Sequence, residues 1–264
     1  MDRRTLLSTV AAGALGAAWP LAQAQVLDLS DAINKAGRQR MLSQRMGKAW
    51  LALLQGVEPN SARLVLDKSL ALFDRQLVEL KGYAPTPDLL ATYRTLETVW
   101  SDYKAALVGK TPTKDNASAL LQLDSKVLAL AQQGTVQYET ALAKPVGKLV
   151  NLAGRQRMLT QRMAKFYLAA ALPVDTQLAT TEIAKARTEF NAAMVQLRDA
   201  PQATLRIKDE LLLGDAQWIF FDMALQKLQD GAPRSKAMAD VFVASENLLT
   251  VMDRVTSLYA ELKA

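Results

Sequence analysis

An internal repeat limits the folds open to this chain more than any other feature of its sequence. Residues 37–46 read GRQRMLSQRM and residues 154–163 read GRQRMLTQRM, so the same ten residues return 117 positions later with one difference. Aromatic residues recur in the same order at slowly growing separations: Phe73 with Phe190, Trp100 with Trp218, and Tyr138 with Tyr259. Because loops absorb such insertions, we interpret the chain as a tandem duplication.

The apolar residues within each copy follow a helical period, and clusters of Gly and Pro separate the helical stretches. This pattern predicts an all-α protein of two tandem antiparallel four-helix bundles. We place the first bundle at residues 25–143 and the second at 144–264. Only Pro145 and Gly147 interrupt the junction, so we expect the last helix of the first bundle to continue into the second through a kink.

The first 24 residues are typical of a secretory signal peptide. Arg3 and Arg4 precede an apolar run over 6–19, and Ala-Gln-Ala at 22–24 fits a cleavage site. The paired arginines resemble a twin-arginine export signal. An uncleaved membrane anchor is the alternative, although the run is short for a span. We therefore predict an exported, periplasmic protein without a transmembrane helix in its mature chain, which disfavours nucleic acid as a partner.

Composition removes many kinds of chemistry. The chain has no Cys and no His, which excludes thiol nucleophiles, the usual zinc sites and histidine acid–base catalysis. Its acidic residues show no paired spacing that suggests hydrolysis. We predict a protein that is not an enzyme, with no catalytic residues, no metal and no cofactor. The formal charge of +6 instead points to an anionic partner, because the repeated motif concentrates arginine.

A helical projection separates the residues of the repeated motif. Arg40 and Gly37 lie on the face opposite the expected core, and Arg157 and Gly154 take the same places in the second copy. A helical Gly costs roughly 1 kcal/mol relative to Ala, and a compensating use is close approach of a backbone or ligand. The predicted ligand-binding residues are Arg40, Arg157, Gly37 and Gly154, with Arg38, Gln44, Arg45, Arg155, Gln161 and Arg162 as further candidates.

Two arginines that converge in a partly dry cleft would bind a small anion well, because an anion between them relieves their repulsion. Arginines repeated along a helix can equally be solvated or paired with nearby carboxylates. The sequence leaves three arrangements open. The two motifs meet within one chain, they pair between chains of a homodimer, or they lie apart in bundles stacked end to end.

The repeated segments, INKAGRQRMLSQRMGK at 33–48 and VNLAGRQRMLTQRMAK at 150–165, resemble a known helix. It is the signature helix of NarX-type nitrate/nitrite sensors and of the related PilJ-type domain of type IV pilus chemotaxis transducers. The resemblance implies a periplasmic four-helix bundle. In the NarX-type sensors the anion lies between two first helices, held by an Arg from each helix and by backbone near the motif Gly. The matching residues here are Arg40 and Arg157, with Gly37 and Gly154.

Family sensors carry transmembrane helices and a cytoplasmic output, which this sequence lacks. We therefore expect a periplasmic binding protein for nitrate or nitrite that passes its occupancy to a membrane receptor or transporter. The alternative is an interaction module whose arginine face docks on an acidic surface of such a partner, without a small ligand.

Overall fold

The computed structural model describes residues 25–109, 111–172, 176–230 and 235–262, and these ranges are almost entirely helical. They contain eight α-helices and no β-strand, which confirms the predicted fold class of tandem helical bundles. The helices are α1 (Leu29–Leu54), α2 (Pro59–Tyr83), α3 (Pro87–Val108), α4 (Lys114–Leu142), α5 (Pro145–Ala169), α6 (Thr176–Asp199), α7 (Leu205–Gln226) and α8 (Ser235–Ala260), with a short 3₁₀ turn, η1 (Lys227–Asp230). The predicted signal peptide lies outside the described residues.

Local sequence explains where several helices begin. Helices α2, α3 and α5 each begin with a proline: Pro59, Pro87 and Pro145. An N–H at the first helical position has no acceptor within the helix, so its absence in proline costs no hydrogen bond. The side chains of Thr86 and Thr204 accept hydrogen bonds from the first-turn N–H groups of α3 and α7, each at 3.3 Å.

The duplication is visible in the packing of each bundle. Trp100 stacks on Phe73 with ring centroids 4.0 Å apart, and Trp218 stacks on Phe190 at 4.4 Å. A tyrosine then ties the fourth helix of each bundle to the second. The Tyr138 hydroxyl donates to the Leu80 carbonyl at 2.6 Å, and the Tyr259 hydroxyl donates to the Leu197 carbonyl at 2.5 Å. The same contacts therefore stabilise both copies.

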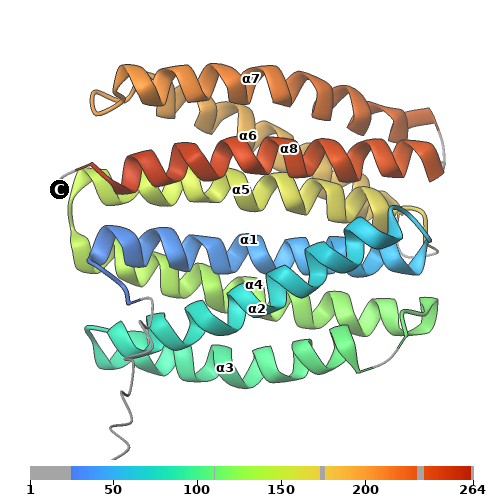
Figure 1. The fold of residues 1–264 in the computed structure, drawn as a ribbon, viewed down its shortest axis with the longest axis horizontal. Coiled ribbons are helices and arrows are strands. Elements are labelled where there is room, and N and C mark those ends of the chain that lie inside the picture. Colours follow the sequence, from blue (N-terminus) through green and yellow to red (C-terminus); the bar gives the residue numbers. More distant parts are fainter. Residues whose placement is uncertain (1–24, 110, 173–175, 231–234, 263–264) are drawn as a thin grey trace, which may run out of the picture.

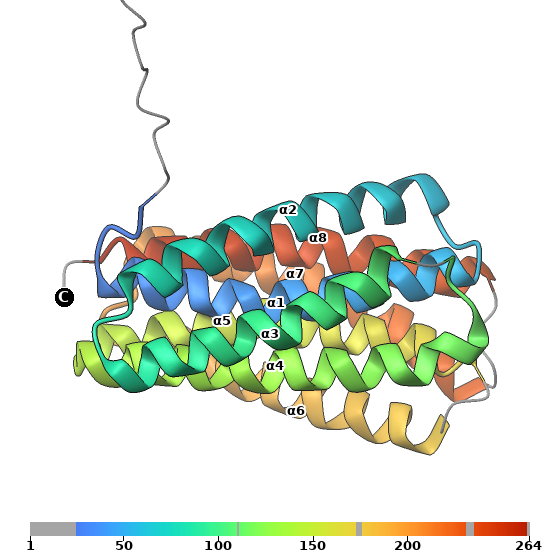
Figure 2. The same cartoon turned by 90° about the horizontal axis from the view of Figure 1, so that it is seen from below.

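The two motif helices, α1 and α5, run parallel to each other through the middle of the molecule (Figures 1 and 2). Their contacts keep the same register along their length. At one end Ile33 lies against Gly147. At the other end the Gln55 side chain donates to the Leu168 carbonyl at 3.0 Å. The bundles thus lie side by side, with α2, α3 and α4 on one side of this pair and α6, α7 and α8 on the other. The two motifs meet within one chain.

The expected kink between the bundles is wrong, because the chain reverses direction there. Helix α4 ends before Ala143, which adopts a left-handed conformation with φ of 53°, and α5 begins at Pro145. Gly147 does not break a helix and lies inside α5. A Cβ on it would stand 2.9 Å from Leu142 Cδ2 and 3.2 Å from Ile33 Cδ1. The glycine therefore allows α5 to pack closely against α4 and α1.

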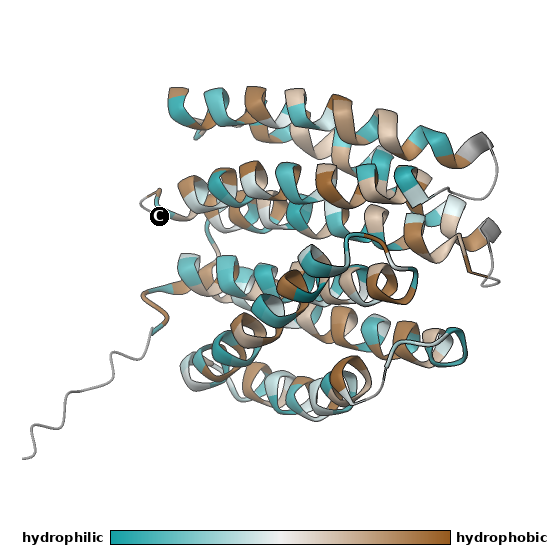
Figure 3. Cartoon of the chain, turned by 45° about the vertical axis from the view of Figure 1, so that its right-hand side comes forward, coloured by the Kyte–Doolittle hydropathy of each residue, from teal (hydrophilic) through white to brown (hydrophobic). Residues whose placement is uncertain are grey.

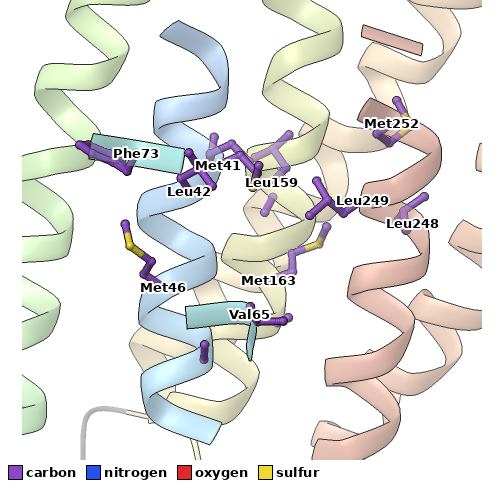
Figure 4. Packing of buried hydrophobic residues seen from close by; sticks show 14 of the residues in the cluster. Met41, Leu42, Met46, Val65, Phe73, Leu159, Met163, Leu248, Leu249 and Met252 are labelled. Atoms are coloured by element: carbon purple, nitrogen blue, oxygen red, sulfur yellow. The ribbon is translucent and has the colours of Figure 1, made fainter. Parts of the chain in front are cut away.

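One apolar core runs through both bundles. Figure 4 shows part of it, from Met46 on α1 to Met163 on α5 and Met252 on α8. All three are fully buried. A shared core of this kind argues that the two repeats fold as one unit, because apolar side chains of both repeats are buried in the same cluster.

Candidate anion-binding site

The two motif glycines face each other where α1 and α5 cross. A Cβ built on Gly37 would lie 3.8 Å from the Gly154 Cα, at ordinary van der Waals distance, so a side chain here would already touch the other helix. The same point lies 3.1 Å from Nη2 of Arg40 and 3.6 Å from Nη2 of Arg157. From Gly154 the corresponding distances are 3.5 and 3.3 Å. Both guanidinium groups therefore converge on the glycine crossing, from opposite helices.

Each arginine of this pair reaches across to the other repeat. Both residues are fully buried. Nη2 of Arg40 donates to the Asn151 carbonyl at 3.3 Å, and Nη2 of Arg157 donates to the Asn34 carbonyl at 3.0 Å. Within the described ranges, the Nε–H groups of both arginines are left without a hydrogen-bond acceptor. Buried donors of this kind are rare and call for an explanation.

The remaining partners break the symmetry of the pair. Nη1 of Arg157 donates to Asp253, whereas Nη1 of Arg40 donates to the amide oxygen of Gln132 at 2.6 Å. Gln132 and Asp253 are equivalent positions, separated by 121 residues as Tyr138 and Tyr259 are. Arg157 thus has a carboxylate counter-charge, and Arg40 forms no ion pair with any residue that the structure describes.

Burial makes the charged state of both arginines unfavourable. Burial, together with the nearby charges of Arg155 and Arg157, lowers the pKa of Arg40 to about 9. Burial together with Arg38 lowers the pKa of Arg157 to about 10, although Asp253 acts in the opposite direction. An anion beside the two guanidinium groups would offset this cost, because it favours their protonated forms.

The flanking arginines of the motif form ion pairs away from the glycine crossing. Arg38 and Arg45 on α1 pair with carboxylates of α8 in the other bundle, Asp253 at 3.0 Å and Glu246. Their counterparts on α5 pair within their own bundle instead. Arg155 binds Glu189 and Arg162 binds Glu182, both on α6. These four candidates therefore border the buried pair rather than join it.

Residues 21–144 and 138–258 each match the family described as "Type IV pili methyl-accepting chemotaxis transducer N-term", or PilJ. The chain belongs to the PilJ family. It carries the domain twice and is a tandem helical sensor module. No curated protein and no solved structure matches it.

A second buried polar layer lies about two turns beyond the arginine pair of the PilJ repeats. Lys165 pairs with Asp124, and both side chains are almost completely buried. The equivalent Lys48 donates to Ser245 Oγ at 2.8 Å and to Glu246 at 2.7 Å. Burial lowers the pKa of Lys48 to about 8. Lys48 and Arg45 lower the pKa of Glu246 to about 2, even though burial alone would raise it.

The two motif glutamines belong to this lysine layer. The Gln44 side chain donates to Asp124 at 2.9 Å, and the Gln161 side chain donates to the Ser245 carbonyl at 3.1 Å. The sequence predicted Gln44 and Gln161 as further ligand-binding residues, whereas Asp124 and both lysines were missed. For the two lysines the repeat itself is a signal, since Lys48 and Lys165 are 117 residues apart. Asp124 carries no such signal, because its equivalent position holds Ser245.

Over the described ranges, no helix of this PilJ protein is both long and apolar enough to cross a membrane. The same ranges hold no group of three or more acidic, His or Cys side chains placed to bind a metal ion.

Proposed function

We propose that this tandem PilJ module is a periplasmic sensor that binds one small oxyanion, nitrate or nitrite, between Arg40 and Arg157. The observation that carries the proposal is the convergence of two fully buried guanidinium groups on one glycine crossing, where Arg40 has no ion-pair partner among the described residues. The resemblance of the motif helices to those of NarX-type nitrate/nitrite sensors supports the same ligand. The periplasmic location rests on the predicted signal peptide.

The arrangement of donors suits a planar oxyanion. Nε and Nη2 lie along one edge of each guanidinium group, and such an edge matches two oxygens of a trigonal anion. The Nε–H groups are already free of protein acceptors, and each Nη2 would exchange one backbone carbonyl for the anion. Since even a Cβ on Gly37 would lie within 4 Å of both Nη2 atoms and of the Gly154 Cα, a small anion is favoured over a larger tetrahedral one.

Isothermal titration of residues 25–264 with nitrate, nitrite, sulfate and chloride at low salt tests the proposal. We expect saturable binding of nitrate or nitrite at one anion per chain, and affinity for sulfate at least about tenfold lower, because 1.4 kcal/mol of lost fit gives that factor. Two anions per chain would contradict a single shared site. A folded sample that binds none of the four would overturn the proposal altogether.

The alternative function, a module that docks on a membrane receptor or transporter, needs a different surface from the one predicted. Arg40 and Arg157 are buried and cannot meet a protein partner. Helix α7 offers apolar side chains instead, and brown segments recur along it in Figure 3. Six of them are more than half exposed: Leu205, Leu212, Leu213, Ile219, Phe220 and Met223. Three of these side chains, Leu205, Leu212 and Ile219, are spaced seven residues apart. A seven-residue apolar repeat is the spacing that packs against an amphipathic partner helix.

The first repeat provides a control for this surface. Ser101 and Asp102 on α3 stand where α7 has Ile219 and Phe220, 118 residues later. The double variant Ile219→Ser/Phe220→Asp therefore copies α3 onto α7. If a helix of a membrane receptor or transporter docks there, this variant loses a partner that cross-linking to wild-type α7 identifies. Equal cross-linking of both proteins would exclude α7 as the docking surface.

A further inference from the structure

A groove of about 310 Å³ opens between α4, α5 and α6, next to the buried arginine pair. Its walls carry three basic side chains, Arg155, Arg162 and Lys185, and the two glutamates that pair with the arginines. Gln132 also lines the groove. A concave wall with a basic excess attracts small anions from solution, since it raises their local concentration.

The pseudo-equivalent side of the molecule, between α8 and α1, is closed by ion pairs. Asp253 bridges Arg38 and Arg157, and Glu246 bridges Arg45 and Lys48. On the groove side, Gln132 and Ser125 stand where α8 has Asp253 and Glu246, 121 residues later. The arginines of α5 turn to α6 instead. At these two positions α4 has no carboxylate to form an ion pair with α5, and the groove opens beside them.

One neutral side chain, Gln132, both lines this groove and contacts Arg40. The Gln132 amide oxygen accepts from Nη1 of Arg40 at 2.6 Å and from Nη1 of Arg155 at 3.2 Å. Arg155 lines the groove and Arg40 is fully buried. Moving an amide away from two arginines costs less than moving a carboxylate, because charge-assisted hydrogen bonds are about twice as strong as neutral ones.

We propose that this groove is the path by which the anion reaches the arginine pair, and that Gln132 is the side chain that must move to admit it. The inference rests on the proposed function and adds a direction to it. Anions pass on the α4 side and not on the α8 side, where Asp253 holds Arg38 and Arg157 together. A path controls how fast a ligand arrives and leaves, whereas the free-energy difference between the free and bound states decides the affinity.

The experiment uses the absence of cysteine from the chain. Ala129→Cys places one thiol in the groove wall, and Thr250→Cys places one at the equivalent position of α8, 121 residues later. Both native side chains are exposed, so a bulky maleimide can be attached to the full chain without entering the core. Nitrate exchange rates come from the line shapes of the Gly37 and Gly154 amide NMR signals, and affinity comes from titration.

We expect the label at position 129 to slow nitrate association and dissociation together by about tenfold or more, with Kd changed less than twofold. The label at position 250 should leave both rates unchanged. Unchanged rates with the label at position 129, or equal slowing at both positions, would overturn the path while leaving the arginine site intact. Failure of the unlabelled protein to bind nitrate would overturn the site and the path together.

Discussion

Replacement of Arg40 by methionine is expected to abolish nitrate binding and, in nitrate-free buffer, to raise the free energy of unfolding by about 1–3 kcal/mol. Binding should weaken by about 100-fold or more, because one of two desolvated donors to a charged ligand is lost. Stability should rise because Arg40 is fully buried without an ion pair among the described residues, and methionine fills a similar apolar volume. Titration and urea unfolding measure the two effects.

Two further variants show whether the effect belongs to the unpaired charge. Arg157→Met should weaken nitrate binding equally but increase stability less, because Asp253 then keeps only Arg38. Arg63→Met, at an exposed position of α2, should change neither property by more than about 0.5 kcal/mol. The prediction would be wrong if Arg40→Met were destabilising, since Arg40 would then stabilise the fold rather than serve a ligand.

Asp124→Ala is expected to lower the free energy of unfolding by about 3–5 kcal/mol. Asp124 is fully buried and is the carboxylate partner of Lys165. It also accepts from the side chains of Gln44 and Tyr103. The substitution therefore leaves a buried ammonium group without its counter-charge. It also removes one acceptor from Gln44 and one from Tyr103, whose remaining acceptors are on Ser43. Urea unfolding of the variant and the wild type gives the difference.

The second repeat suggests a variant that restores this layer. There Ser245 and Glu246 receive Lys48 in place of a buried aspartate. The double variant Asp124→Ser/Ser125→Glu copies that pair onto α4 and should recover more than half of the stability lost in Asp124→Ala. Asp102→Ala, at an exposed position of α3, controls for the loss of one negative charge. Loss of less than about 1 kcal/mol in Asp124→Ala would contradict the assigned role.

Much of the fold could be predicted because the repeat and the helical period of the apolar residues are both visible in a single sequence. The turn between the bundles could not. The chain reverses at Ala143, in a left-handed conformation that alanine seldom adopts, while the glycine that signals a break, Gly147, serves close helix packing. Tertiary contacts decide both conformations, and a single sequence does not reveal them.

The site was predictable in part for the same reason. The shared face of Arg40 and Gly37 follows from helical geometry alone, and the structure places both at the helix crossing. Gln132 and Asp253 were missed because the fourth helices are related by 121 residues and not by 117, so a search at the motif's own spacing does not align them. Their contacts with the arginines also depend on which helices become neighbours, and a periodic pattern does not determine that.

Joining the two repeats in one chain frees them from a constraint that binds every symmetric dimer. In a homodimer a residue on one side of the two-fold axis has an identical twin on the other, so both sides must be equally open or equally sealed. Here Gln132 and Asp253 differ while Gly37 and Gly154 are the same. Evolution can therefore change each flank of the axis independently. One flank can be selected for passage of an anion and the other for stabilising ion pairs, while the centre stays symmetric.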